Sequence, residues 1–407
     1  MHVLIVGGGA AGIAAAIAAA KRGHRVTVLE RGRKALKKLG VTGNGRGNLL
    51  NRGEGQYFGD CGFAASVLEH MPYERIAAFL EETGIPLVHE DEGRMYPSSY
   101  LAASAVDALR WQAERLGVSI VVNTRAVRIE KTSKGFAVHA SQTTFAPDIT
   151  LKSGRVKPGE AIGEEAVTFR GDRVIVTAGG AAAPIHGTDG TAYGLLTEHG
   201  HSLVPIHPAL SALVTDKKAV EGLTGQRVRA KLTLCGRDGQ PLHESEGEAL
   251  FAEDGVSGIA AMQLSRFAYD GCVLHMDLRP AVTGSTDTDV LAWLLHRAQT
   301  RDERSLLTGA ASPAVSAALW RRSGHSPEKL AQVIEDFTVP VTGVRGFESA
   351  QVTAGGVSCA EFDPATMESR LVPGLYAAGE VLDVDGACGG FNLMFAFAGG
   401  LLAGGVH

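Results

Sequence analysis

Three glycines near the N-terminus have the spacing of a phosphate-binding turn. The stretch Gly7-Gly8-Gly9-Ala10-Ala11-Gly12 fits the pattern G-x-G-x-x-G. In this pattern Gly7 permits a tight turn, Gly9 lets the backbone approach a pyrophosphate, and Gly12 lets a helix pack closely on a sheet. A helix that begins at Ala10 presents N–H groups and a partial positive charge to the phosphates.

An acidic residue follows at the distance expected for a ribose contact. Glu30 lies 23 residues after Gly7, at the end of the next apolar strand, where its carboxylate can accept hydrogen bonds from a ribose diol. An acidic side chain at this position disfavours a 2′-phosphate, so the tightly bound dinucleotide is not expected to be NADP. The alternative, a glycine-rich helix start without a ligand, leaves Glu30 unexplained.

The segments around this motif predict a βαβ unit. Residues 3–6 indicate a buried strand, residues 10–21 an alanine-rich helix and residues 25–30 a second strand. Such a unit belongs to a parallel sheet with right-handed crossovers, as in α/β nucleotide-binding domains. The glycine- and asparagine-rich stretch 40–48 cannot hold a regular element, so we expect a functional loop there.

The rest of the chain predicts an α/β fold in which the nucleotide-binding domain is interrupted by antiparallel β structure and a small helical insert and is completed by the C-terminal segment. Alternating segments from about residue 203 to 277 indicate antiparallel strands, and the pattern from 287 to 337 is helical. After Pro340 the composition returns to that of the start. The expected divisions are 1–190 and 351–407 for the cofactor domain, 191–282 plus about 338–350 for the β domain, and 283–337 for the helical insert.

Composition narrows the possible partners. The chain has 407 residues, a formal net charge of −5 and a pI near 6.3, which argues against a dedicated nucleic-acid binder. Its five cysteines form no CxxC pair and none of its 14 histidines has a ligand spacing, so no metal site or disulfide framework is predicted. Every stretch of about 18 residues, the length that a membrane-spanning helix needs, is interrupted by polar residues. We therefore expect a cytoplasmic protein without nucleic-acid or membrane partners.

Three downstream segments favour FAD over NAD as the dinucleotide. One buried strand ends in the small residues Ala178 and Gly179, which allow a cofactor to approach closely. A second buried strand ends in Gly379 and Glu380, which place an acid beside a ribitol hydroxyl. Gly389–Leu393 opens the last helix, and its N–H groups can stabilise negative charge on a reduced flavin.

The chain resembles a bacterial family of FAD-dependent flavoproteins that includes aminoacetone-oxidase-like enzymes and BaiN-type bile-acid reductases. The resemblance spans the whole chain, in the stretches GGGAAG, KKLGVTGNGRGN, GRMYPSS, VTAGG, GTDGTAYGL, VTAGGVS and MESRLVPGLYAAGEVLDVDGACGGFNLMFAFAGG. It implies FAD as the cofactor. It also implies a Rossmann-like FAD-binding domain made from both chain ends, with an inserted β-barrel-like domain and a small helical subdomain, which agrees with the organisation above.

The resemblance also implies which residues contact FAD. It adds Arg31 at the adenosine end, Val127 as the residue whose backbone holds the adenine, and Lys38 with the loop 42–48 along the flavin and pyrophosphate. Many relatives read GGGRCN in this loop, whereas here Gly47 replaces the cysteine, so no thiol role applies. The predicted cofactor-binding residues are Gly7, Gly9, Ala10, Ala11, Gly12, Glu30, Arg31, Lys38, Thr42, Gly43, Asn44, Gly45, Arg46, Asn48, Val127, Ala178, Gly179, Gly379, Glu380, Asn392 and Leu393.

The expected activity moves a hydride between a small organic substrate and flavin N5, in a cleft between the FAD domain and the inserted β domain. No second G-x-G-x-x-G is present, so NAD(P)H, if it is the donor, visits the flavin transiently. An NAD(P)H-dependent enone reductase and an oxidase that passes electrons to oxygen, such as an amine-type aminoacetone oxidase, fit the same residues. The alternative of another class is a flavin-bound binding or regulatory protein. The sequence singles out no catalytic side chain and no oligomeric state.

Overall fold

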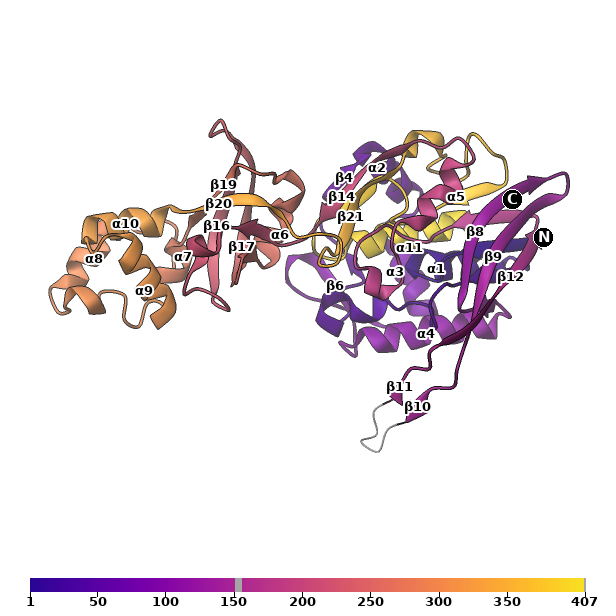
Figure 1. The fold of residues 1–407 in the computed structure, drawn as a ribbon, viewed down its shortest axis with the longest axis horizontal. Coiled ribbons are helices and arrows are strands. Elements are labelled where there is room, and N and C mark those ends of the chain that lie inside the picture. The colour runs from indigo at the N-terminus through magenta and orange to yellow at the C-terminus, as the bar shows by residue number, and fades with distance from the viewer. Residues whose placement is uncertain (151–155, 406–407) are drawn as a thin grey trace. The chain divides into compact units, whose positions relative to one another are not determined.

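A computed structural model describes residues 1–150 and 156–405 (Figure 1). The chain divides into two compact units, each with its own hydrophobic core. Unit 1 comprises Met1–Ile206 and Val352–His407, and unit 2 comprises His207–Gln351. Residues 191–206, which we expected in the inserted domain, lie in unit 1 because Tyr193, Leu195 and Leu196 are buried in its core.

Unit 1 is built on a five-stranded sheet in the order β22-β13-β1-β2-β7. All four strand pairs are parallel. The strands are β1 (His2–Val6), β2 (Arg25–Leu29), β7 (Ser119–Val121), β13 (Arg173–Val176) and β22 (Leu375–Ala377). The expected βαβ unit is present, with α1 (Ala10–Lys21) between β1 and β2. Because β22 comes from the C-terminal segment, both ends of the chain build one sheet, and its strands end at one shared edge.

Two helices from opposite ends of the chain pack together beside this sheet. They are α1 and α11 (Phe391–Ala403), drawn in indigo and yellow in Figure 1. Close approach requires glycine, because a Cβ at Gly400 would lie 3.0 Å from the Cα of Ala11. The other helices of unit 1 are α2 (Cys61–His70), α3 (Tyr73–Glu82), α4 (Ala102–Arg115) and α5 (Gly194–Thr197).

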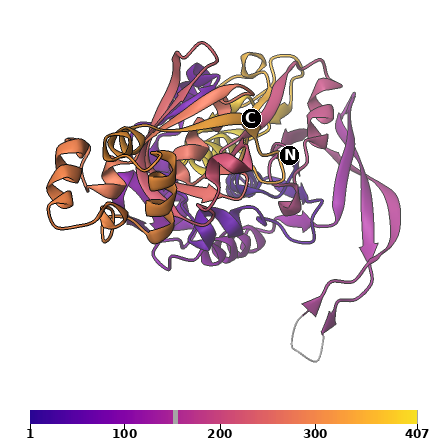
Figure 2. The same ribbon diagram turned by 60° about the vertical axis from the view of Figure 1, so that its left-hand side comes forward.

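Smaller sheets complete unit 1. Strands β3 (Leu50–Asn51), β6 (Arg94–Pro97) and β5 (Leu87–His89) form one sheet, and β4 (Tyr57–Gly59) pairs with β23 (Val384–Gly386). The expected hairpin near residues 126–140 is β8 (Thr124–Thr132) with β9 (Gly135–Phe145), and β12 (Ala161–Gly171) adds a third strand. Figure 2 shows the pair β10 (Ile149–Thr150) and β11 (Val156–Lys157) extending from the ends of β9 and β12. Strand β14 (Leu203–Ala209) pairs with β21 (Val352–Val357).

Unit 2 contains a closed barrel in the order β15-β18-β17-β16-β19-β20; the alternating pattern predicted its antiparallel strands, and the family resemblance implied the barrel. The strands are β15 (Leu213–Thr215), β16 (Arg227–Cys235), β17 (Pro241–Ala252), β18 (Gly255–Ser257), β19 (Cys272–Asp277) and β20 (Phe337–Val344). Along β16 every second side chain is buried, which fills the barrel. Its helices are α6 (Ile259–Leu264), α7 (Arg279–Val282), α8 (Val290–Ala298), α9 (Pro313–Arg322) and α10 (Pro327–Glu335).

The helical insert begins where capping side chains allow it. Asp289, Ser312 and Ser326 each accept a hydrogen bond from the backbone three residues on, and so cap α8, α9 and α10. These three helices gather at one side of the barrel (Figure 1). Among the described helices, none is long and apolar enough to cross a membrane.

Candidate functional site

The turn between β1 and α1 has the shape that a phosphate-binding turn requires. Gly7 has a φ of +105°, and a Cβ there would lie 2.6 Å from the carbonyl oxygen of Thr177. A Cβ at Gly12 would overlap the carbonyl oxygen of Gly7, so α1 starts in close contact with the turn. Gly9 differs, because a Cβ there would meet no atom within 4 Å. The helix start at Gly9, which no side chain caps, is therefore accessible to a ligand.

Glu30 is fixed next to this turn. Its carboxylate accepts hydrogen bonds from the backbone N–H groups of Gly8 at 2.8 Å and Gly32 at 2.6 Å. Burial raises the pKa of Glu30, and these two hydrogen bonds oppose the rise. The neighbouring Arg31 forms an ion pair with Asp189 at 2.6 Å. The carboxylate is thus held rigidly at the end of β2, where a ribose contact was predicted.

The predicted adenine contact lies at an irregularity in the β8–β9 ladder. The register shifts between Ala126 and Arg128, so Val127 has no paired partner on β9. Nearby, Asn123 has a φ of +55° and donates from its backbone to the carbonyl of Gly32 at 2.9 Å. Its side-chain oxygen is buried without a hydrogen-bond partner among the described residues. Unpaired groups therefore gather at this end of the site, which suits a ligand with polar edges.

The loop after β2 combines helical and left-handed backbone. A 3-10 helix runs over Leu39–Gly45 and is broken at Thr42, which is extended, and at Gly43 and Asn44, which have φ of +56° and +55°. The side-chain oxygen of Asn48 is buried without a partner in the described part of the chain. A buried, unpaired amide oxygen costs free energy unless a ligand satisfies it.

Gly47, which replaces the cysteine of many relatives, is in a position that only glycine suits. Its φ is +76°, and a Cβ would lie 3.0 Å from the Cα of Ala102 at the start of α4. A cysteine would be strained by both the dihedral angle and the contact. The loop is packed against α4 in a way that depends on this glycine.

Three segments meet at one edge of the sheet: the residues after β13, the residues after β22 and the start of α1. Ala178 and Gly179 follow β13, and Gly379 follows β22, the strand that pairs with β13. Gly179 and Gly379 have φ of +75° and +79°. A Cβ at Gly379 would lie 3.1 Å from the Cβ of Ala11 in α1. The structure thus brings these predicted residues to the same edge as the glycine turn.

Lys38 and Glu380 form an ion pair at 2.7 Å that joins segments 342 residues apart. The other oxygen of Glu380 accepts a hydrogen bond from the backbone of Thr353 at 2.9 Å. The Thr353 hydroxyl accepts from the backbone N–H groups of Ala181 and Ala182, at 2.8 and 3.0 Å. Thr353 was not predicted, because its only sequence signal is a hydroxyl residue within a buried strand.

The N-terminus of α11 is open to a ligand, although the side chain of Asn392 is not. Gly390 caps this helix with a φ of +105° and supplies no side-chain hydrogen bond to the first N–H groups of the helix. The amide of Asn392 accepts from the backbone of Gly386 at 2.8 Å and donates to its carbonyl at 2.7 Å. The Asn392 side chain therefore bonds within the protein, and a ligand contact of Asn392 and Leu393 would use their backbone N–H groups.

Asn51 supports the turn before α11 and was not predicted. Its amide nitrogen donates to the carbonyls of Gly389 at 2.8 Å and Glu92 at 3.1 Å, and its oxygen accepts from Gly53 at 2.7 Å. The residue is 3% exposed. A single asparagine after two leucines carries no sequence signal for this role, because its partners are distant in the chain.

A serine–histidine–glutamate row in unit 1 is structural. His201 contacts Glu361 through Nδ1 and Ser369 through Nε2, both at 2.9 Å. The Ser369 hydroxyl also accepts from the backbone of Leu371 and Val372, at 3.1 and 2.9 Å. The His201 side chain is 0% exposed, so no substrate reaches this serine. The row ties residues 201–202 to the segment before β22.

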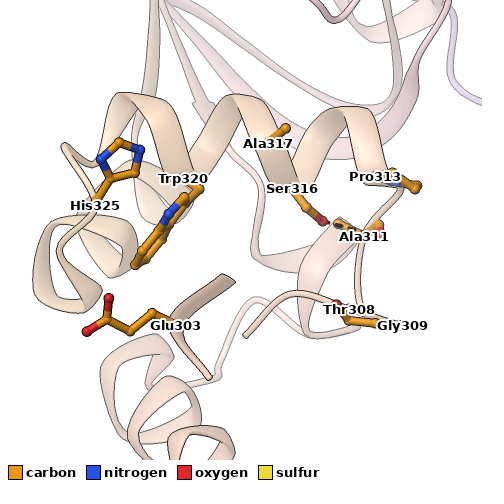
Figure 3. Close-up of a pocket in the computed structure, with 9 residues that line it drawn as sticks. All are labelled: Glu303, Thr308, Gly309, Ala311, Pro313, Ser316, Ala317, Trp320 and His325. Carbon is orange, nitrogen blue, oxygen red and sulfur yellow. Dashed lines mark hydrogen bonds between the residues drawn. The ribbon is translucent and has the colours of Figure 1, made fainter. Parts of the chain in front are cut away.

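Figure 3 shows a pocket that is distinct from these residues. Its volume is about 710 Å³ and it lies within the helical part of unit 2. It is lined by Glu303, Thr308, Gly309, Ala311, Pro313, Ser316, Ala317, Trp320 and His325. No predicted cofactor residue lines it. In the described ranges no group of histidine, cysteine and acidic residues could hold a metal.

The geometry of unit 1 fits FAD. An open helix start lies at Gly9 for the pyrophosphate, and unpaired polar atoms lie near the ends of the site, at Asn123 and Asn48. A second open helix start lies at Gly390. A dinucleotide with a flavin at one end would use all of these groups.

Comparisons with known proteins agree with this arrangement. The model of the HI0933-like protein Rossmann domain matches residues 1–406. The 3-dehydro-bile acid delta(4,6)-reductase of Clostridium scindens is 33% identical over 424 aligned residues, which cover 98% of this chain and 97% of that protein. The ribosomal RNA dihydrouridine synthase of Escherichia coli is 25% identical over 421, covering 97% and 95%.

A solved structure shares the fold. The 3-ketosteroid-delta4-(5alpha)-dehydrogenase of Rhodococcus jostii, in complex with 4-androstene-3,17-dione, has a TM-score of 0.50 and 16% sequence identity. The match covers 99% of this chain and 95% of that one.

Proposed function

The chain belongs to the HI0933-like Rossmann family of FAD-dependent oxidoreductases, and from that premise we propose that it reduces a carbon–carbon double bond conjugated with a carbonyl group. The observation that carries the proposal is the 33% identity, over nearly the full length of both chains, to a relative named as a delta(4,6)-reductase. The name dihydrouridine synthase likewise denotes the saturation of a ring double bond. One reaction class therefore covers both names.

The residues of unit 1 support this function by the way they would hold the cofactor. The first turn of α1 would bind the pyrophosphate, Glu30 the ribose and the Val127 backbone the adenine. The Lys38–Glu380 pair would lie along the ribityl chain, and the N–H groups of α11 would face the electron-rich side of the flavin. Bound FAD supplies the hydride chemistry, and these residues orient it.

The proposed reaction is balanced by NAD(P)H and water. The substrate gains a hydride equivalent at the carbon β to its carbonyl and a proton from water at the α carbon. One NAD(P)H is oxidised to NAD(P)⁺ and provides both electrons. No second dinucleotide motif is present, so the donor is expected to bind transiently.

Charge favours a small-molecule substrate over RNA. Unit 2 contains 15 lysines and arginines against 18 aspartates and glutamates, and the whole chain carries a formal net charge of −5. Proteins that bind RNA depend on a basic surface that neutralises phosphates. We therefore propose a small conjugated ketone as the substrate.

An anaerobic titration of the FAD-loaded protein tests the proposal. NADH or NADPH should bleach the flavin band near 450 nm, and 4-androstene-3,17-dione should then restore it with loss of the enone absorbance. Reoxidation by a uridine-containing RNA and not by the enone would refute the choice of substrate. Bleaching by aminoacetone but by neither nucleotide would establish the oxidase instead. A flavin that nothing reduces would favour a binding or regulatory protein.

A further inference from the structure

Two aromatic rings and an ion pair lie together on unit 1. The residues are Arg46, Tyr96, Tyr100 and Glu90, and we call them the tyrosine–arginine cluster. The guanidinium carbon of Arg46 lies 4.4 Å from the ring centre of Tyr96 and 4.8 Å from that of Tyr100. The two ring centres are 5.9 Å apart. A terminal nitrogen of Arg46 pairs with the Glu90 carboxylate at 2.5 Å. Two rings and one guanidinium plane are thus held together.

The cluster is attached to both segments that we assign to the flavin. Arg46 belongs to the loop 42–48, and a Cβ at Gly43 in this loop would lie 3.7 Å from a ring carbon of Tyr96. Tyr96 is in β6, which pairs with β3. From β3, the amide of Asn51 binds the carbonyl of Gly389 just before α11. These connections place the cluster at the flavin end of the site.

Tyr100 has a strained backbone that burial of its ring does not explain. Its φ is +53°, a conformation that costs a non-glycine residue about 1–2 kcal/mol. The residue is nevertheless 38% exposed, and the adjacent Leu101 is 59% exposed. Strained residues of this kind cluster at active sites and ligand-binding sites. An exposed tyrosine and leucine in sequence also offer an apolar surface.

The charges of the cluster favour an uncharged ligand. The hydrogen bond that Arg46 donates to Glu90 raises the pKa of Arg46, so the guanidinium stays charged, and the Glu90 carboxylate balances that charge. Aromatic rings and guanidinium planes stack on flat conjugated molecules. A ligand carboxylate, however, would meet the negative charge of Glu90.

We propose that Tyr100, supported by Arg46 and Tyr96, binds the flat face of an uncharged conjugated ketone, and that Glu90 selects against anionic substrates. This inference rests on the proposed function, since it names the residues that would bind and select the substrate class proposed for the same site. It assigns Tyr100 to substrate binding and Glu90 to specificity.

Tyr100→Gly separates this role from a structural one. Glycine removes the ring and also relieves the strained φ, so the melting temperature should stay constant or rise and FAD should be retained. The Kd of the holoenzyme for 4-androstene-3,17-dione, measured from the change in flavin absorbance, should rise tenfold or more. Tyr100→Phe should bind like the wild type. Trp111→Ala, which removes an aromatic side chain that is 59% exposed on α4, is the matched control and should change neither value.

Glu90→Gln tests the specificity. We compare the kcat/KM values of this variant for the anionic 3-oxo-4-androstene-17β-carboxylate and for the neutral dione. The ratio of the anionic to the neutral substrate should be about threefold to tenfold higher than in the wild type. This range is modest because Glu90 is partly exposed and water screens its charge.

The outcomes separate this inference from the proposed function. Wild-type turnover of the dione together with unchanged binding by Tyr100→Gly overturns the inference alone, as does an unchanged preference in Glu90→Gln. The wild type could instead bind the dione without turning it over, while Tyr100→Gly fails to bind it. That result supports the inference and contradicts the proposed reaction. If the wild type binds neither steroid, both are wrong.

Discussion

Alanine at Gly9 and at Gly12 should affect two different properties of the protein. Both residues belong to the glycine turn, yet a Cβ at Gly9 would meet no atom within 4 Å, whereas a Cβ at Gly12 would lie 2.7 Å from the Thr177 hydroxyl and would overlap the Gly7 carbonyl. Gly9 also has a φ of −79°, which any residue can adopt. We therefore expect Gly9→Ala to impair cofactor binding and Gly12→Ala to impair folding.

The expected magnitudes follow from these contacts. Non-bonded carbon and oxygen atoms normally stay about 3.5 Å apart, so the overlap with the Gly7 carbonyl oxygen forces α1 of Gly12→Ala away from the turn by about 1.5 Å. Overpacking of this kind typically costs about 1–3 kcal/mol of unfolding free energy. Alanine in place of the capping Gly9 should cost no more than about 1 kcal/mol. If the methyl group occupies the space of the pyrophosphate, FAD affinity should fall at least 100-fold, about 2.7 kcal/mol.

Urea unfolding of the FAD-free proteins and fluorescence titration with FAD measure the two quantities separately. The apoprotein is needed because bound FAD itself stabilises the fold by mass action. Gly9→Ala that binds FAD like the wild type would refute the assignment of the open helix start to the pyrophosphate. Equal destabilisation of both apoproteins would show that the space beside Gly9 is not empty.

Three further predictions concern the stability of unit 1. Burial lowers the pKa of His201 in the folded protein, although the contact with Glu361 opposes this shift. As the pH falls below about 6.5, the histidine of the unfolded chain gains a proton before that of the folded protein does. The free energy of unfolding should therefore decrease from this pH down to the lowered pKa of the folded protein. His201→Gln should flatten this part of the stability–pH curve measured by urea unfolding. Asn51→Ala should reduce the unfolding free energy by about 1–3 kcal/mol in the same assay, because it leaves buried backbone groups unpaired. Gly47→Cys should cost about 1–2 kcal/mol by the strain at φ +76°, and a melting temperature equal to that of the wild type would contradict it.

The elements with a strong periodic signal could be predicted from the sequence. The strand β1, the helix α1 and the strand β2 have bounds within one residue of those expected, because their apolar patterns and their turn residues agree. The strand β12 has no such signal. Its side chains are mostly exposed, and its pairing with β9 rather than a buried face stabilises it. Periodicity detects burial, so a strand that buries little escapes it.

The spacing of the residues alone points to a site only where a residue lies at a strand end or a helix start, whereas Lys38, the loop 42–48 and Val127 were predicted from the family resemblance. Glu30, Gly379 and Glu380 follow parallel strands, and parallel topology alone brings such positions to one edge of the sheet. Thr353 and Asn51 could not be found this way, since they act through partners distant in sequence.

The same distinction bears on where catalysis should be sought. The residues that sequence motifs identify, such as Glu30 and Gly9, serve the shared task of holding a dinucleotide. The reaction of an individual family member must instead be set by side chains that do not belong to a dinucleotide motif yet contact the flavin loop. Tyr96 and Tyr100 meet this condition, because Arg46 joins both rings to that loop. Substitution there should change which ketone is reduced while FAD binding is preserved.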